Sequence, residues 1–210
     1  MTSAKFITLE GIDGAGKTTQ LESLVKWLRE KQVTTVVTRE PGGTPLGEQL
    51  RAMLLDNAVT MHAETEALLM FAARREHLDK VIIPALAQGS WVVSDRFTDA
   101  SFAYQGGGRG LQWEKLEALE SWTQGQLQPD LTLYFDISAA LGQQRVSAIK
   151  ARDRFEQEQL DFHQRVREAY LMRARQFPQR IHVIDACQPV DTVKAAVEQQ
   201  LINLFETGST

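Results

Sequence analysis

The sequence predicts an α/β fold in which a five-stranded parallel sheet is flanked by helices on both faces. Short apolar runs rich in β-branched residues recur along the chain, and longer amphipathic segments separate them. With 210 residues, of which 43% are apolar, the chain can bury one sizeable core. The alternation of strands with helices favours parallel pairing, because each helix returns the chain to the same edge of the sheet. We therefore expect a single domain over residues 1–210.

Five runs are expected to form buried strands, because each is short, apolar and β-branched-rich. They are residues 6–9, 33–37, 91–93, 131–137 and 181–184. Helical spacing of apolar residues predicts helices over 21–28, 46–55, 62–88 and 193–204, and a further long helix is expected to start near Glu156. Pro84 lies inside the third of these helices, so its last turns are expected to be kinked or to start separately.

Composition excludes several classes of protein. The formal net charge is -4 with 24% charged residues, so there is no general basic field to bind DNA. No stretch of about 18 apolar residues is present to span a bilayer. The one cysteine, Cys187, cannot form an internal disulfide, and no long apolar signal region precedes the first strand. We expect a soluble cytoplasmic protein with no nucleic-acid or membrane partner.

A phosphate-binding loop, or P-loop, follows the first predicted strand. Residues 11–19 match the pattern G-x-x-x-x-G-K-[ST] at every fixed position, and a helix is predicted directly after them. Lys17 is expected to neutralise the β- and γ-phosphate oxygens of ATP, and the Thr18 hydroxyl to bind Mg²⁺. A glycine-rich turn with a surface lysine is the alternative, and the order of strand, loop and helix argues against it. The residues expected to hold ATP are Gly11, Ile12, Asp13, Gly14, Ala15, Gly16, Lys17, Thr18 and Thr19.

A carboxylate for the same Mg²⁺ is expected at the end of another strand. Asp95 follows the apolar run at 91–93 and lies at the carboxyl edge, where open α/β sheets bind ligands. Mg²⁺ prefers oxygen ligands in octahedral geometry. Asp95 is therefore a candidate metal ligand together with Thr18, and the alternative is that Asp95 caps a helix beginning near Thr98.

Arginines at the same edge indicate a second anion site. The second strand runs into Thr-Arg-Glu-Pro-Gly-Gly-Thr at 38–44, an irregular turn that leaves Arg39 and Glu40 at the ligand-binding edge. Arg51 and Arg96 supply two guanidinium groups that can clamp a second phosphate bidentately. Arg51 also fits the simpler role of a surface ion-pair partner.

Residues 147–159 are rich in charged and polar residues, and we expect them to form an exposed, mobile lid. This segment contains Lys150, Arg152 and Arg154, and Arg145 lies just before it. Cations on a mobile segment suit a reaction that spreads negative charge over transferring phosphoryl oxygens. A solvated charged surface is the alternative.

Together these motifs resemble the thymidylate kinase family, and the likeness runs nearly end to end. It rests on residues 11–19, 38–44, 95–97, 103–110 and 153–158. The resemblance implies a P-loop nucleoside-monophosphate-kinase-like fold, a homodimer, and the use of ATP and Mg²⁺ to phosphorylate dTMP to dTDP. That reaction is a step of dTTP synthesis by both the de novo and salvage routes.

The resemblance also implies roles for individual residues. Gly14 follows Asp13 where some members have an arginine, so the chain is similar to the bacterial members whose catalytic arginine lies in the lid. Gln105 can both donate and accept, as the imide edge of thymine requires. The implied catalytic residues are Lys17, Asp13, Arg96, Arg152 and Arg154. The implied dTMP-binding residues are Glu40, Arg51, Phe71, Arg74, Arg96, Ser101, Tyr104 and Gln105.

The residue under the base departs from the commonest family spacing. The family places a phenylalanine four residues before the arginine that reaches the base carbonyl, and Arg74 fits that arginine. Four residues before Arg74 is Met70, while Phe71 is only three before it. Both positions share one helix face with Arg74. We favour Phe71 because of its ring, and the alternative places Met70 under the base and Phe71 in the core.

Three other functions compete with this interpretation. A deoxynucleoside kinase needs a carboxylate to take a proton from a sugar hydroxyl, and Glu40 or Asp95 would serve. The pair of Arg51 and Arg96 argues instead for an acceptor that already carries a phosphate. A GTPase-type switch requires an N-K-x-D segment, which the sequence lacks. A purely structural protein would leave the loop, the arginines and the lid unexplained.

Overall fold

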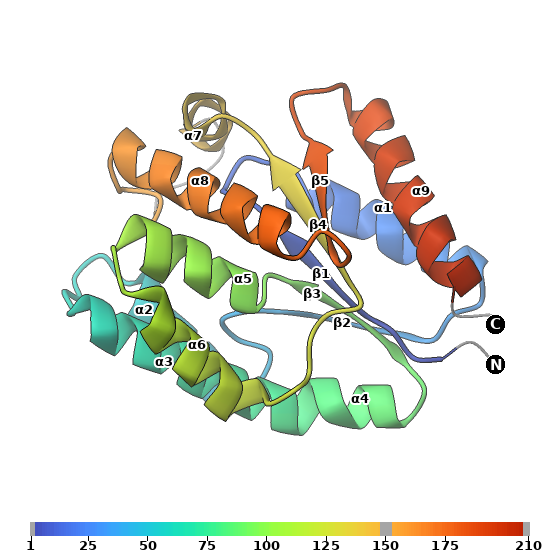
Figure 1. Cartoon of the computed structure of the whole chain (residues 1–210), viewed down its shortest axis with the longest axis horizontal. Coiled ribbons are helices and arrows are strands. Elements are labelled where there is room, and N and C mark those ends of the chain that lie inside the picture. Colours follow the sequence, from blue (N-terminus) through green and yellow to red (C-terminus); the bar gives the residue numbers. More distant parts are fainter. Residues whose placement is uncertain (1–2, 148–152, 208–210) are drawn as a thin grey trace.

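The structure, a computed structural model, describes residues 3–147 and 153–207. Five parallel strands form one sheet in the order β2-β3-β1-β4-β5, which confirms the predicted α/β class (Figure 1). The strands are β1 (Phe6–Glu10), β2 (Thr35–Arg39), β3 (Trp91–Asp95), β4 (Leu131–Asp136) and β5 (Ile181–Asp185).

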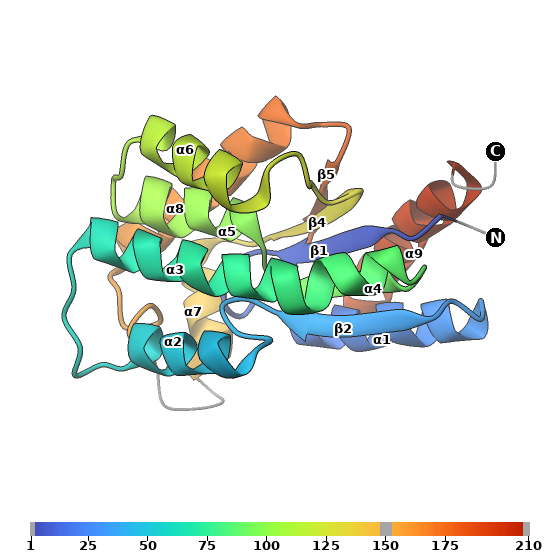
Figure 2. The same ribbon diagram turned by 90° about the horizontal axis from the view of Figure 1, so that it is seen from below.

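Helices cover both faces of this sheet, as predicted. On one face α1 (Lys17–Glu30) packs against α9 (Val190–Thr207), and on the other α4 (Ile83–Ala87) and α8 (Leu160–Gln176) contact the strands. At one end of the molecule α2 (Pro45–Leu55), α3 (Ala63–His77) and α6 (Trp113–Gln124) lie side by side (Figure 2). The remaining elements are α5 (Thr98–Ser101), α7 (Ala139–Ser147) and two π-helical segments, η1 (Leu78–Ile82) and η2 (Phe102–Gly108).

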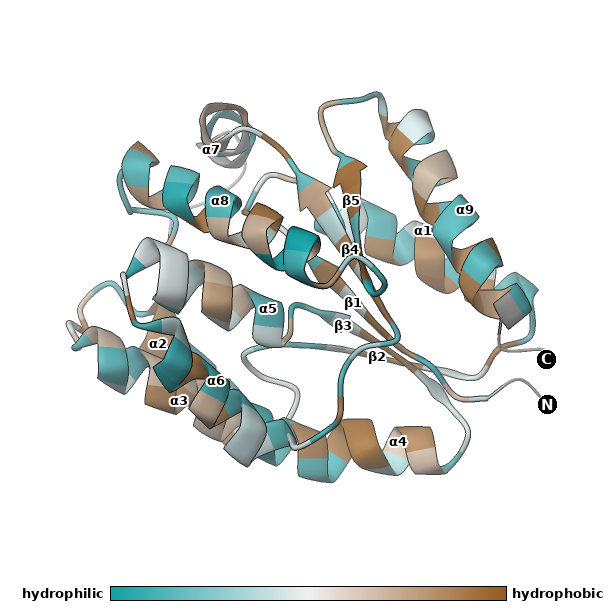
Figure 3. Cartoon of the chain, viewed as in Figure 1, coloured by the Kyte–Doolittle hydropathy of each residue, from teal (hydrophilic) through white to brown (hydrophobic). Residues whose placement is uncertain are grey.

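The core lies on the central strands. All five residues of β1 are buried, while the edge strands β2 and β5 are partly exposed. The central strands are mainly hydrophobic, and the helices alternate between hydrophobic and hydrophilic residues (Figure 3). The prediction of five buried strands is wrong for the two edge strands, because each has a neighbour on one side only.

In the part of the chain that the structure describes, no helix combines the length and apolar character needed to cross a membrane.

The predicted helix over 62–88 continues through a π-helical turn. α3 ends at His77, η1 follows directly, and α4 carries Pro84 in its first turn. Proline is tolerated there because the first turn of a helix does not need its backbone N–H. The wider turn of η1 thus lets the chain pass Pro84 without a break.

The segment before α8 differs from the prediction. α8 begins at Leu160 and not near Glu156, because residues 153–158 close a turn of their own. Asp153 Oδ1 accepts hydrogen bonds from the backbone N–H groups of Phe155 and Glu156, each at 3.0 Å. Glu156 in return accepts one from the Asp153 N–H at 3.0 Å. Phe155 and Glu156 are buried, so this part of the predicted lid is not an exposed excursion.

Candidate active site

The phosphate-binding loop joins β1 to α1 at the carboxyl edge of the sheet. Gly14 and Gly16 adopt φ angles of 83° and 85°, a left-handed conformation that side chains disfavour. A Cβ on Gly14 would also lie 2.3 Å from the carbonyl oxygen of Gly142 in α7. No side chain caps the start of α1, and its first turn holds no acidic residue. The N-terminal end of this helix is therefore suited to an anion.

Lys17 is buried at the base of this loop. Its Nζ donates to the carbonyl oxygens of Gly11 at 2.9 Å and Ile12 at 3.2 Å, and lies 3.8 Å from Asp13 Oδ1. Burial lowers the pKa of Lys17, and the cation of Arg96 lowers it further. An anionic phosphate would offset both effects, because its negative charge stabilises the Lys17 cation that burial has taken out of water and that Arg96 repels.

Asp95 and Thr18 have the chemistry expected of Mg²⁺ ligands. Asp95 Oδ1 is buried and has no hydrogen-bond partner among the residues that the structure describes. The alternative role for Asp95 is not observed, because α5 has Phe97 at its N-cap and no side-chain capping bond. Thr18 is exposed in the first turn of α1. One carboxylate and one hydroxyl fit Mg²⁺, which keeps several waters and binds phosphates directly.

A cavity opens beside the loop, at the ends of β2 and β3. Its volume is about 700 Å³ when the open mouth is included. Of the predicted site residues, it is lined by Asp13, Glu40, Arg51, Arg74, Arg96, Ser101, Tyr104 and Gln105. The other lining residues are Pro41, Leu55, Met70, Phe97, Ala100, Asp153, Phe155 and Glu156. The structure thus gathers residues from distant parts of the sequence around one space.

Arg51 and Arg96 are two of the three arginines among the described residues that line the cavity. Arg96 adopts a φ of 71°, and its Nη2 donates to Asp13 Oδ1 at 2.9 Å. Arg51 Nη1 donates to the carbonyl oxygen of Pro41 at 2.9 Å. Burial lowers the pKa of Arg51, and the cations of Arg39 and Arg96 add to this effect. Two cations in the wall of one cavity favour an anion between them.

Arg74 crosses the floor of the cavity. Its Nε donates to Glu40 Oε2 at 2.7 Å, and its Nη2 to the carbonyl oxygen of Phe97 and to Ser101 Oγ. Nη1 of Arg74 is buried and has no partner within 3–147 and 153–207. Since Arg74 lines the cavity, this N–H group is a candidate donor to a bound ligand.

Met70, and not Phe71, lies in the cavity wall. The Phe71 side chain is 2% exposed and packs with Ala67, Phe102 and Leu116 in the core. Its ring also lies under the guanidinium of Arg74, 4.6 Å away. This placement favours the alternative expectation, with Met70 beside the base and Phe71 in the core, because the residue three before Arg74 turns toward the interior of the helix layer. Which of the two covers the base stays a prediction.

The predicted lid arginines are only partly described. Arg154 Nη1 lies 2.7 Å from Glu66, its Nε donates to the Leu54 carbonyl oxygen at 2.9 Å, and it does not line the cavity. Arg152 and Lys150 lie outside the described residues. Arg145 Nη1 donates to the carbonyl oxygens of Gly14 and Ala186, joining the P-loop to the loop after β5.

The comparison with known families decides between the candidate reactions. The sequence model of the thymidylate kinase family matches residues 9–197 of this chain. The chain belongs to the thymidylate kinase family. Membership confirms the predicted activity, the ATP-dependent phosphorylation of dTMP to dTDP, over a deoxynucleoside kinase or a GTPase-type switch.

Individual relatives cover nearly the whole length. The thymidylate kinase of Nitrosospira multiformis is 66% identical over 201 residues, which is 96% of this chain and 98% of that protein. The thymidylate kinase of Nitrosomonas europaea is 61% identical over 199 residues, or 95% and 93% of the two chains. The crystal structure of thymidylate kinase from Ehrlichia chaffeensis has a TM-score of 0.78 at 35% identity, covering 95% of this chain and 98% of that one.

The sequence analysis did not identify several polar residues that contact or adjoin the cavity residues. Glu66 accepts bonds from Gln105 Nε2 at 2.8 Å and from Arg109, and His77 Nδ1 lies 3.0 Å from Glu40 Oε1. Glu10, at the end of β1, is also buried. The sequence carried a signal for Glu10, because the rule that selects Asp95 at the end of a strand applies equally to Glu10. Glu66 and His77 lie inside a predicted helix and carry no such signal.

Proposed function

We propose that the cavity binds dTMP with its phosphate between Arg51 and Arg96, facing the γ-phosphate of ATP held on the P-loop. The observation that carries this proposal is that one cavity includes Asp13 of the loop and both guanidinium groups. An acceptor that already carries a phosphate needs such a clamp, whereas a neutral nucleoside does not. The product of transfer is then dTDP.

The reaction needs little proton chemistry. The second pKa of a phosphate monoester is about 6, so the dTMP phosphate is largely dianionic at neutral pH and no catalytic base is required. Lys17 is proposed to neutralise the β- and γ-phosphate oxygens and Arg96 the acceptor phosphate. Asp13 lies between them, 3.8 Å from Lys17 Nζ and 2.9 Å from Arg96 Nη2, and is proposed to orient both. Positioning and charge neutralisation supply the catalysis.

Thr18 and Asp95 are proposed to hold Mg²⁺. The buried, unbonded Oδ1 of Asp95 supports this role within the described part of the chain. When bound, Mg²⁺ supplies positive charge to the β- and γ-phosphate oxygens. The described residues include no cluster of three or more His, Cys, Asp or Glu side chains suited to a metal. This agrees with an ion held mainly by water and phosphate.

The far end of the cavity is proposed to bind the thymidine part. Arg74 Nη1 is proposed to donate to a base carbonyl, and Met70 to cover the base through its polarisable thioether. Gln105 donates through Nε2 to Glu66, which fixes its amide against the cavity. Ser101 and Tyr104 line the same wall and are proposed to face the nucleoside. Glu40 is proposed to act through Arg74, to which it is paired.

The catalytic role of Arg152 and Arg154 remains a proposal based on the family resemblance. In this structure Arg154 is paired with Glu66. For Arg154 to reach the transferring phosphoryl group, that ion pair must open. Measurement of kcat for Arg152→Ala and Arg154→Ala tests the proposal, because a lid arginine that acts only in the transition state lowers kcat and leaves the KM for ATP unchanged.

A homodimer in the cytoplasm is also proposed. Three neighbouring helices, α2, α3 and α6, lie at one end of the molecule (Figure 2), and each carries at least one large exposed apolar side chain. These side chains are Leu46, Met53, Leu68 and Trp122. Such a surface is typical of a protein interface. Light scattering after size-exclusion chromatography tests the dimer, and a monomer at micromolar concentration would contradict it. Cytoplasmic location is supported by the free thiol of Cys187.

The decisive experiment measures ADP formation from ATP and Mg²⁺ with each acceptor in turn: dTMP, thymidine, dUMP, dCMP or none. We expect strong turnover with dTMP, and a collapse of that turnover in Arg96→Ala. Arg29→Ala, at the far end of α1 from the loop, is the matched control and should keep normal turnover. Use of thymidine in place of dTMP would overturn the proposed clamp of Arg51 and Arg96.

A further inference from the structure

The guanidinium of Arg96 is held by partners that its position after Asp95 does not predict. Nη2 donates to Asp13 Oδ1 at 2.9 Å, and Nη1 donates to the hydroxyl oxygen of Tyr170 in α8 at 3.3 Å. The guanidinium carbon lies 4.9 Å from the ring centre of Tyr104. Arg96 therefore has three supports, and Tyr170 is the one that lies outside the cavity lining.

Tyr170 is itself held by the buried carboxyl group of Glu10. The Tyr170 hydroxyl donates to Glu10 Oε2 at 2.7 Å, so its oxygen lone pairs remain free to accept from Arg96. Glu10 Oε1 accepts from the backbone N–H of Phe97 at 2.7 Å. One carboxyl group thus fixes both the backbone directly after Arg96 and the tyrosine that contacts the Arg96 side chain.

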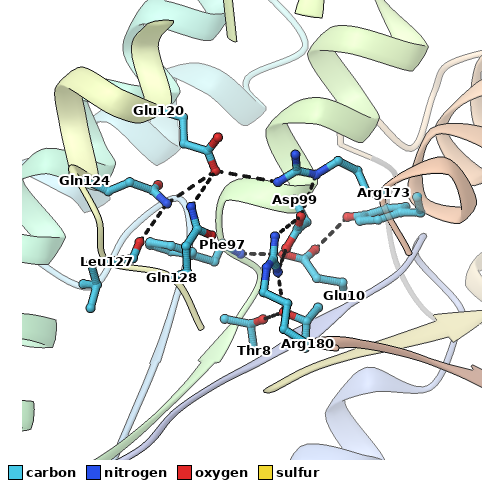
Figure 4. A network of polar contacts seen from close by, with 12 residues as sticks. Thr8, Glu10, Phe97, Asp99, Glu120, Gln124, Leu127, Gln128, Arg173 and Arg180 are labelled. Carbon is cyan, nitrogen blue, oxygen red and sulfur yellow. Dashed lines mark hydrogen bonds and ion pairs between the residues drawn. The ribbon is translucent and has the colours of Figure 1, made fainter. Parts of the chain in front are cut away.

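A network of charged side chains lies beside Glu10. Figure 4 shows Glu10 beside Asp99, Arg173 and Arg180. Asp99 accepts from Arg173 Nε at 2.8 Å and from Arg180 Nη1 and Nη2 at 2.7 and 2.9 Å. Burial raises the pKa of Asp99, but the two guanidinium groups outweigh that effect and lower it. The network joins α5, α8 and the start of β5, so it forms a rigid support.

We propose that Tyr170 is a positioning residue that aims Arg96 at the acceptor phosphate, with Glu10 holding Tyr170 in place. This inference rests on the proposed role of Arg96 in binding dTMP. The strained backbone of Arg96, with a φ of 71°, gives the side chain its direction, and Tyr170 and Asp13 fix its end. Loss of the Tyr170 hydroxyl leaves the guanidinium with one anchor fewer while the fold keeps its ring.

The chain offers a matched control for this hydroxyl. Tyr134 in β4 stacks on Tyr170, with ring centres 4.8 Å apart and an angle of 22° between the planes. Its hydroxyl donates to Asp136 at 3.0 Å, away from Arg96. Tyr170→Phe and Tyr134→Phe therefore each remove one hydroxyl from the same stacked pair, and only the first removes a contact to Arg96.

The test compares steady-state kinetics and melting temperatures of both variants. Tyr170→Phe is expected to lower kcat/KM for dTMP about tenfold, the effect of losing one hydrogen bond to a charged group, and to leave the KM for ATP unchanged. Tyr134→Phe is expected to keep wild-type kinetics. The proposal would be overturned by equal kinetic effects in the two variants, or by equal effects on the kinetic constants for dTMP and for ATP. Either result would indicate a general loss of packing, which affects both tyrosines and both substrates alike.

A double-mutant cycle separates this inference from the proposed function. In an Arg96→Ala background, Tyr170→Phe should cause no further loss in kcat/KM for dTMP, because its target is gone. Additive losses would show that Tyr170 acts independently of Arg96 and would overturn the inference alone. Normal dTMP turnover in Arg96→Ala would instead overturn the proposed role of Arg96.

Discussion

Replacing Glu10 by glutamine is expected to remove a large pH dependence of stability. Glu10 ends β1 and is fully buried. Burial, with the nearby carboxylate of Asp99, raises the pKa of Glu10 from 4.5 to about 8. Arg96, the Tyr170 hydroxyl and the Phe97 N–H oppose this shift without cancelling it. The folded protein therefore keeps the Glu10 proton at pH values where the unfolded chain has lost it.

The sign and the size of the effect follow from this difference. Between pH 4.5 and about pH 8 the folded state binds one more proton than the unfolded state. The free energy of unfolding therefore falls as the pH rises, by about 1.4 kcal/mol per pH unit. The stabilising contribution is complete below pH 4.5 and is lost by the time the pH passes about 8, a total on the order of 5 kcal/mol.

Urea unfolding of the wild type and of Glu10→Gln at pH 5, 6, 7 and 8 and fixed ionic strength measures this contribution. Glutamine cannot ionise, so the variant should gain stability relative to the wild type with each step in pH. Glu22→Gln, which changes an exposed carboxylate of α1, is the control and should follow the wild type. If Glu10→Gln and the wild type lose stability in parallel from pH 5 to 8, the raised pKa is refuted.

Three further predictions follow from the cavity and its surroundings. Met70→Ala should raise the KM for dTMP about tenfold with little change in melting temperature. Phe71→Leu should lower the free energy of unfolding by about 1–2 kcal/mol and leave the KM for dTMP unchanged. The reverse pattern would show that Phe71, and not Met70, contacts dTMP. Arg51→Ala should raise the KM for dTMP about tenfold or more and not that for ATP, and equal effects would argue against an acceptor clamp. Gly107→Ala should lower the free energy of unfolding by about 1–3 kcal/mol, because the added Cβ would lie 2.6 Å from the Cβ of Ala169. Unchanged urea unfolding would contradict the close packing of η2 on α8.

The sequence alone was sufficient for the fold class, and it predicts the phosphate site. Local patterns carry both, because apolar runs define strands and the G-x-x-x-x-G-K-[ST] spacing defines a loop whose conformation is set by its glycines. The edge rule for parallel sheets also placed Arg96 next to the loop, where the structure pairs it with Asp13. Arg51 and Gln105 also line the cavity, and their roles in binding stay predictions.

Local turn chemistry explains one error at the lid. Asp153 and Glu156 satisfy each other's backbone groups in a closed turn, so the helical composition after Glu156 does not start a helix until Leu160. Charge content alone predicted an exposed segment, but Phe155 is buried edge-on against Tyr104, with ring centres 5.7 Å apart. Composition cannot report a contact between residues so far apart in the chain.

What the sequence determined by itself is therefore the kind of protein: a parallel α/β sheet with an ATP loop and arginines at its carboxyl edge. What only the tertiary structure decided is which side chains meet. The direction in which each helix residue points puts Met70, and not Phe71, in the cavity lining. The hydrogen bond between Tyr170 and Glu10 joins residues 160 positions apart. The physical reason is that strands, loops and helices follow short-range patterns, whereas side-chain partners depend on how those elements pack.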